Sequence, residues 1–250
     1  MSRFTRMTLF LVGGGCVAAM LTLAFLDMPA FGGSKHPYRD HAVAAAVQHG
    51  TANVVSAVNF DQRGIDTFGE ETIMLGSVVG VAMLLRPGEH EHEEEDPGTG
   101  RVLDSTRLAA YLVLAVTLMV GLDVVVHGHV TPGGGFQGGV VLATGAHLLY
   151  VGGRYPALRR VTPEIVYEIG ESFGAAAFAG LGIAGIAVSG AFLANLLPNG
   201  TFGQLFSAGS VPLLSIAVGI EVACGTVVLL AQFLRQELVI RPNDRGDGSS

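Results

Sequence analysis

The sequence predicts an all-α, polytopic membrane protein of about six transmembrane helices with a glycine-rich loop. Half of its 250 residues are hydrophobic and its mean hydropathy is +0.51. Only 14% of the residues are charged, against about 25% in soluble domains. Glycine, with 36 residues, reaches about twice its usual ~7% share, which is typical of closely packed membrane helices.

Five apolar runs are long enough to cross a bilayer, since about 20 residues span its hydrocarbon core as a helix. These runs are Phe4–Leu26, Ile65–Leu85, Leu108–Val126, Ile165–Leu197 and Pro212–Leu234. A sixth, Gly138–Val151, is shorter and needs the glycine-rich stretch before it to cross. The run Ile165–Leu197 is overlong, so we expect it to be tilted or broken at its glycines.

The positions of arginine and lysine agree with six spans in the cell membrane and both termini in the cytoplasm. On that topology the cytoplasmic side includes Arg3, Arg6, Arg86, Arg107, Arg154, Arg159, Arg160, Arg235, Arg241 and Arg245. Only Lys35, Arg39 and Arg63 fall on the other side, as expected when positive charge is retained inside. The first run could instead be a cleaved signal peptide, but its length favours an anchor.

An acidic segment, "GEHEHEEEDPGTG", divides the chain. We expect a two-helix module over residues 1–86, a linker over 87–103, a four-helix domain over 104–240 and a disordered tail over 241–250. His90 and His92 could bind a metal weakly, but mutually repelling acids between proline and glycine favour a solvated linker.

The sequence lacks the patterns of soluble catalysis. It has no phosphate-binding glycine–lysine loop, no zinc-type His-Glu pattern and no cysteine cluster, and Cys16 and Cys224 both lie in apolar runs. We therefore expect no catalytic residue, metal site or cofactor, and no nucleic-acid partner.

Ionisable residues within the spans are candidates for an ion path, because such residues are costly in a membrane. Asp66 and Glu70 are four residues apart and share a helix face, and Glu71 flanks them. These acids either cap the helix at the membrane surface, with Arg63 as their partner, or relay protons or cations. The two interpretations remain open.

The second half of the chain holds further candidates. Glu168 and Glu171 are three residues apart, so we expect them to face one way. Glu221 lies near the middle of the last span and His147 in the short sixth run. A buried carboxyl and an imidazole both suit proton transfer, although each alone could simply bond a neighbour.

The stretch "TPGGGFQGG" follows Asp123, His127 and His129, which could form a gate or plain surface. Pro132 ends the preceding helix direction, and Phe136 is the one large side chain in a bare loop. The glycines are Gly133, Gly134, Gly135, Gly138 and Gly139. Non-helical backbone at membrane depth must be covered by protein or water. We therefore favour a partly re-entrant hairpin buried against neighbouring subunits over a simple external turn.

Two motifs resemble one family of complexes. "TPGGGFQGGVVLATG" is similar to the B subunit of the multisubunit Mrp (Mnh) cation/proton antiporters. "VNFDQRGIDTFGEETIMLGSVVGV" resembles the C-terminal end of their large A subunit, or its separate equivalent in related hydrogenases. Here the first module stands apart from any antiporter-like domain and is fused to the B-like domain through a long acidic linker.

The resemblance implies an accessory membrane subunit of a complex I-related assembly that exchanges sodium or other monovalent cations for protons. Its partners would be other membrane subunits, including large antiporter-like ones, and the lipid bilayer. Arg63, Asp66 and Glu70 fall on the charged positions of one motif, and Pro132 to Phe136 on the other. The alternatives are a purely structural subunit and a subunit of a redox-coupled ion pump such as a membrane-bound hydrogenase.

Overall fold

The computed structural model describes residues 3–28, 32–33, 36–85, 102–161 and 164–239, without the side chains of residues 154–161, 164 and 235–239. The acidic linker, with His90 and His92, and the C-terminal tail lie outside the described residues. The described elements are all helical: α1 (Arg3–Leu26), α2 (Pro37–Gln48), α3 (Val54–Ala57), the π-helical turn η1 (Val58–Gln62), α4 (Gly64–Leu84), α5 (Asp104–Val126), α6 (Gly135–Val161), α7 (Glu164–Ser189) and α8 (Val211–Val239). The predicted all-α class is confirmed.

Helix α1 belongs to a separate compact unit, Met1–Asp40, and none of its own residues is buried. Its 24 residues are long and apolar enough to cross a membrane. The first predicted span is thus a continuous helix with apolar side chains on every face.

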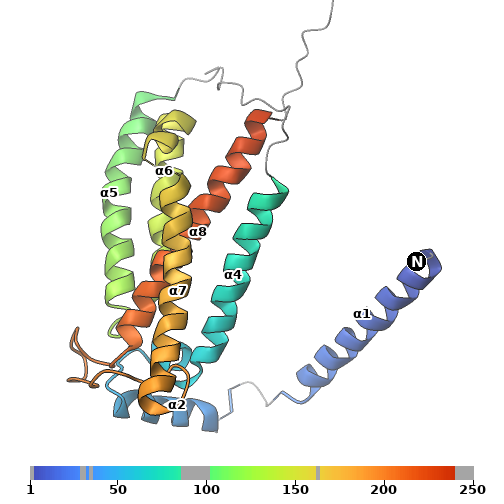
Figure 1. Cartoon of the computed structure of the whole chain (residues 1–250), viewed down its shortest axis with the longest axis vertical. Coiled ribbons are helices and arrows are strands. Elements are labelled where there is room, and N and C mark those ends of the chain that lie inside the picture. Colours follow the sequence, from blue (N-terminus) through green and yellow to red (C-terminus); the bar gives the residue numbers. More distant parts are fainter. Residues whose placement is uncertain (1–2, 29–31, 34–35, 86–101, 162–163, 240–250) are drawn as a thin grey trace, which may run out of the picture. The chain divides into compact units, whose positions relative to one another are not determined.

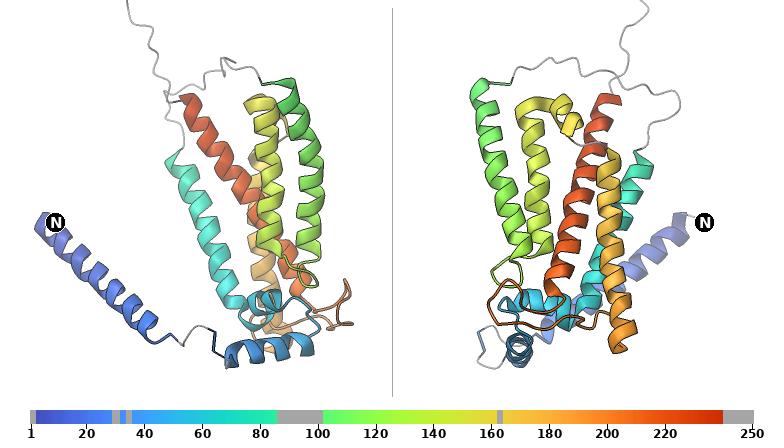
Figure 2. Two further views of the ribbon diagram at one scale, coloured as in Figure 1. Left: turned by 180° about the vertical axis from the view of Figure 1, so that it is seen from behind. Right: turned by 60° about the vertical axis from the view of Figure 1, so that its left-hand side comes forward.

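The remaining long helices form a bundle around α8, which contacts α4, α5, α6 and α7 (Figures 1 and 2). Helices α4, α6 and α8 begin at the end of the bundle where α2 lies, and α5 and α7 end there. We call this the α2 end. Besides α1, the helices long and apolar enough to span are α4, α5, α7 and α8. Helix α6, with 27 residues, contains the shorter sixth run and packs on α5 and α8.

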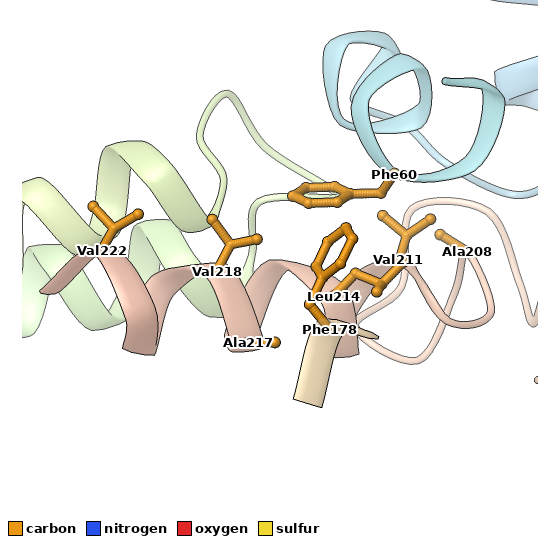
Figure 3. Close-up of a cluster of buried hydrophobic side chains, with 8 residues drawn as sticks. All are labelled: Phe60, Phe178, Ala208, Val211, Leu214, Ala217, Val218 and Val222. Carbon is orange, nitrogen blue, oxygen red and sulfur yellow. The ribbon is translucent and has the colours of Figure 1, made fainter. Parts of the chain in front are cut away.

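The main apolar core lies at the α2 end of the bundle, where side chains of η1 and α7 meet the first half of α8 (Figure 3). Phe60 and Phe178 face each other there with ring centroids 6.4 Å apart, and Phe68 stacks on Phe178 at 6.1 Å. Phe136, expected to plug a bare loop, instead packs against this core from the first turn of α6.

The overlong run Ile165–Leu197 is broken, which is one of the two alternatives that the sequence predicted. Helix α7 ends at Ser189, and Gly190 follows with a φ of +77° that disfavours other residues. The connection to α8 is held by Asn195, whose Oδ1 accepts hydrogen bonds from the backbone N and the Oγ of Ser210, at 2.8 and 3.0 Å.

The second half of the glycine-rich stretch is helical. Helix α6 already begins at Gly135, so Gly135, Gly138 and Gly139 lie in its first turns. A Cβ on Gly135 would lie 2.3 Å from the carbonyl oxygen of Ser215 in α8, and one on Gly138 would lie 2.4 Å from Val125 in α5. These glycines therefore let α6 approach two neighbouring helices, which is how membrane helices pack closely.

The linker expected over residues 87–103 lies almost wholly outside the described residues, and the helices on its two sides pack together. The described residues from His41 onward form one compact unit, and α4 packs on α7 and α8. The two sequence motifs thus belong to the same bundle.

We expect Gly135→Ala to destabilise the bundle, because its new methyl group would collide with the backbone of α8. Overpacking of this kind costs about 1–3 kcal/mol. Gly180→Ala in α7 is the control, since a Cβ there meets nothing within 4 Å. Thermal unfolding of the purified complex in detergent should show a lower midpoint for Gly135→Ala alone. Equal midpoints for the two variants would contradict the close approach of α6 and α8.

Candidate polar site in the membrane bundle

Three glutamates from three helices are buried in the bundle. Glu71 of α4 is 2% exposed, Glu171 of α7 is 3% exposed and Glu221 of α8 is fully buried. Acids enclosed in membrane spans are rare, and they mark ion pathways or paired structural sites. These three carboxyl groups define the candidate site.

The helices carry these acids well inside the bundle. Glu71 is seven residues from the start of α4 and Glu221 ten from the start of α8, or about 10 and 15 Å at 1.5 Å per residue. Glu71 belongs to the buried face of α4, together with Gly64, Thr67 and Val78. The spacing of these four residues follows the helical repeat, so one stripe of α4 faces α7 and α8.

The carboxyl groups of Glu71 and Glu221 are close enough to interact electrostatically. None of their four oxygens has a hydrogen-bonding partner among the described residues, and neither does Oε1 of Glu171. Glu171 also interacts electrostatically with Glu221. The three acids thus form a connected group in which α8 supplies the central member.

Two glycines bring the helices together around this group. A Cβ on Gly174 of α7 would lie 2.7 Å from both the backbone N and the Cβ of Glu221. A Cβ on Gly225 of α8 would lie 3.0 Å from Oε1 of Glu171. Gly225 is one helical turn beyond Glu221, so Glu171 meets α8 one turn further from the α2 end. The acids are therefore arranged stepwise along the bundle.

The arrangement suits proton transfer. A charged carboxylate away from water is costly unless it is paired. Two carboxylates that face each other repel, and a single proton held between them removes that repulsion. No set of three histidine, cysteine or acidic residues in the described part of the chain is arranged to hold a metal ion. The group can thus accept, share and pass on protons.

The other acids predicted in α4 lie on its outer face. Asp66 forms an ion pair with Arg63, and the side chains of both are about half exposed. Glu70 is exposed as well, although it directly precedes the buried Glu71. Asp66 and Glu70 thus share a face, as their spacing predicts. The Asp66 carboxyl that Arg63 contacts lies at the surface of the bundle, as the capping interpretation expects for this pair.

The candidate residues in the second half of the chain also differ in their exposure. Glu168 and Glu171 were expected to face one way, but Glu168 is exposed and Glu171 is buried. His147 is exposed on α6, where its Nδ1 lies 3.1 Å from the carbonyl oxygen of Ala143. Neither Glu168 nor His147 belongs to the buried group. Asp123 and His127 form an exposed pair at 2.8 Å.

The glycine-rich loop between α5 and α6 is held by Asn53, which sequence reasoning missed. Its side-chain Oδ1 accepts hydrogen bonds from the first turn of α3, at Val55 N and Ser56 N. Its Nδ2 points to the carbonyl oxygens of Gly128, Thr131 and Gly133, at 2.7, 3.0 and 3.3 Å. Asparagine is a preferred N-cap residue, so its position directly before the apolar stretch that starts at Val54 is a signal that could have identified it.

A second missed contact links the C-terminal end of α2 to η1. Nδ1 of His49 lies 2.5 Å from Oδ2 of Asp61, which is largely buried. Nε2 of Gln62 donates to the carbonyl oxygen of Ala42, at 3.0 Å. These bonds hold the end of α2 against the start of the first motif.

The structure thus defines a helical membrane protein that encloses three acids in its bundle and carries others on its outer faces. Residues 105–228, about half of the chain, match the family model described as the domain related to the MnhB subunit of Na+/H+ antiporter. The chain belongs to this MnhB family, and the resemblance drawn from the glycine-rich motif is confirmed.

The similarity to known proteins extends beyond residues 105–228. An uncharacterized protein of Methanocaldococcus jannaschii is 29% identical over 193 residues, which cover 69% of this chain and 73% of that protein. A chain of the membrane-bound sulfane sulfur reductase, an archaeal respiratory membrane complex, superposes with a TM-score of 0.70 and 27% identity. That match covers 92% of this chain and 98% of the other.

The Mrp complex from Dietzia sp. contains a similar fold, with a TM-score of 0.67 and 21% identity. The match covers 98% of this chain but only 27% of that chain, so the shared fold is one part of a much longer polypeptide.

We expect Asn53→Asp to destabilise the complex more than Asn53→Ala. Both lose the Nδ2 donor and leave carbonyl groups of the glycine-rich loop unpaired, at about 1–3 kcal/mol. Aspartate keeps the cap of α3 but sets a negative carboxylate against three carbonyl oxygens. Thermal unfolding midpoints of the two variants would test this order. The reverse order would mean that the cap of α3 matters more than the hold on the loop.

Proposed function

We propose that the chain is an accessory, non-enzymatic membrane subunit of a complex I-related multisubunit antiporter that exchanges sodium or another monovalent cation for protons. The MnhB-family domain supports this assignment. The distribution of arginine in the sequence supports a multi-pass placement in the cell membrane with both termini in the cytoplasm.

The observation that carries the mechanism is the burial of Glu71 and Glu221 near each other inside the bundle, with Glu171 one turn further along α8. A proton that enters at Glu71 can be shared with Glu221, and it can then reach Glu171. Because the three acids come from α4, α8 and α7, a small shift between these helices makes or breaks the sequence of transfers.

Neighbouring subunits would complete the path. Glu70 and Glu168 are exposed on spans that are otherwise apolar. An acid in such a position does not face lipid, because lipid offers it neither charge nor hydrogen bonds. We propose that Asp66, Glu70 and Glu168 meet polar or charged groups of adjacent subunits. His147, exposed on α6, is a further candidate for such a contact.

One observation favours a second candidate. The match to the sulfane sulfur reductase chain covers nearly the whole of both chains. The same subunit would then serve a redox-driven ion pump, in which the acids move protons in response to electron transfer in other subunits. Purification of the intact complex separates the two candidates, since only the second contains iron–sulfur or similar redox centres.

We expect Glu221→Gln and Glu71→Gln to lower ion exchange by roughly tenfold or more while the complex still assembles, since a positioned proton-transfer group contributes about 10²–10⁴ in rate. Glutamine keeps the size of the side chain and removes its proton chemistry. The measurement is the sodium-driven pH change in inverted vesicles, with assembly checked on a native gel.

Asp104→Asn is the control, because the side chain of this acid is 92% exposed at the start of α5 and does not belong to the buried group. Glu70→Gln tests the proposed contact with an adjacent subunit, because Glu70 is next to Glu71 but on the outer face. It should also lower exchange with assembly intact. If Glu71→Gln and Glu221→Gln exchange ions like the wild type, the chain is a structural brace. If they prevent assembly, the buried acids hold the helices together.

A further inference from the structure

Three segments pack together at the α2 end of the bundle: residues 49–56, the loop 127–134 and the connection 199–208. We call them the end layer. The backbone N of Asn53 donates to the carbonyl oxygen of His129 at 3.0 Å. Nε2 of His129 lies 3.0 Å from the carbonyl oxygen of Leu205. A Cβ on Gly50 would lie 2.7 Å from the carbonyl oxygen of Asn199. Each segment thus contacts at least one of the others directly.

The end layer contains four buried polar side-chain atoms without a hydrogen-bonding partner in the described structure. They are Thr51 Oγ1, Ser56 Oγ, His129 Nδ1 and Ser207 Oγ. All four residues are at most 2% exposed. Buried polar groups are almost always satisfied by protein or by ordered water. Four such atoms in one layer, contributed by all three segments, therefore indicate a species that the protein itself does not supply.

The chemistry of His129 defines that species. Its Nε2 faces a carbonyl oxygen, so this nitrogen carries the hydrogen and donates. Burial lowers the pKa of His129, which favours the neutral imidazole. Nδ1 is then a lone pair that needs a donor. A hydroxyl both donates and accepts, so Thr51, Ser56 and Ser207 need a small molecule that does the same.

Water meets both needs, and a metal ion does not. The four groups are one neutral imidazole and three hydroxyls, with no carboxylate among them, whereas hard cations prefer several carboxylate or carbonyl oxygens. A water molecule bonds two to four polar neighbours in such sites.

We propose that the end layer encloses ordered water molecules that bond to His129 Nδ1 and to the hydroxyls of Thr51, Ser56 and Ser207, and that this water links the aqueous phase at the α2 end to the buried acids. The layer lies where α4 and α8 begin (Figure 1), before Glu71 and Glu221 along both helices. The link to the acids rests on the proposed function, whereas the presence of the water does not.

Radiolytic labelling of the assembled complex tests for the water, because an X-ray pulse generates hydroxyl radicals from bound water that oxidise adjacent side chains even when they are buried. The chain offers two matched pairs: Ser207→Cys with Ala208→Cys, and Ser56→Cys with Ala57→Cys. Ser207 and Ala208 are each 1% exposed, and Ser56 and Ala57 are at most 2% exposed. The introduced thiols are chemically identical within each pair, so their oxidation rates compare only their surroundings.

We expect the thiols at positions 207 and 56 to be oxidised several-fold faster than those at 208 and 57, as measured by mass spectrometry. Equal rates within both pairs would overturn the proposal. Thr51→Val removes one hydroxyl at nearly constant shape, so it should also slow the oxidation of His129 and lower ion exchange in the assembled complex.

Two outcomes separate this proposal from the proposed function. If Thr51→Val slows oxidation of His129 but leaves exchange unchanged, the link between the water and the acids is overturned. If Glu71→Gln and Glu221→Gln leave exchange unchanged while the thiol pairs differ, the proposed function fails and the water site stands.

Discussion

The bundle depends on one constraint: a carboxyl group at membrane depth must be enclosed by protein. Glu221 satisfies it only because Gly174 of α7 lies against its backbone, at a distance that no Cβ would allow. Gly225 gives Glu171 the same room from the opposite side. These two contacts bring α7 and α8 together, and Glu71 brings α4 to the same place. The glycines and the acids thus act as one structural feature, since without the glycines the carboxyl groups would lose their enclosure.

The same constraint governs the α2 end, where the polar groups belong to the backbone. The loop between α5 and α6 contributes carbonyl groups that no helix satisfies, and Asn53 provides the donor. His129 Nδ1 and Ser207 Oγ are buried there without a hydrogen-bonding partner in the described structure. A dry layer would leave these atoms unpaired, at a free-energy cost that the surrounding apolar packing does not recover. Enclosed water satisfies them, and it brings a proton-conducting medium close to the helix starts that lead to Glu71 and Glu221.

Much of the fold follows from the sequence, because the length of an apolar run fixes a membrane span almost by itself. The runs starting at Phe4, Ile65, Leu108 and Pro212 are each helices of the structure. The break at Gly190 was one of two expected alternatives. The start of α6 was misplaced, since five glycines in nine residues favour a loop in water. In the bundle they form a surface that α5 and α8 approach closely, and this tertiary packing outweighs the weak helix propensity of glycine.

The buried faces could not be predicted for a related reason. In a soluble helix the apolar face marks the core, but the outer face of a membrane helix is equally apolar because it meets lipid. Glu70 and Glu71 are adjacent, so they point about 100° apart, given 3.6 residues per turn, and only packing decides which one is enclosed. The family motif drew attention to Glu70, whereas the structure encloses Glu71. Glu168 and Glu171 differ in the same way, despite their spacing of three.

The separation of inward and outward acids divides the candidate residues into two groups with different surroundings. Glu71, Glu171 and Glu221 are held by this chain alone, and their contacts do not depend on a neighbour. Asp66, Glu70 and Glu168 are on the outer faces, where another subunit determines their surroundings. On the proposed function, the enclosed group would pass protons in response to small movements of α4 or α7, whichever neighbour produces them. If the proposed function holds, a sodium-coupled neighbour and a redox-coupled neighbour would use the same three acids, with the driving force entering through the outer contacts.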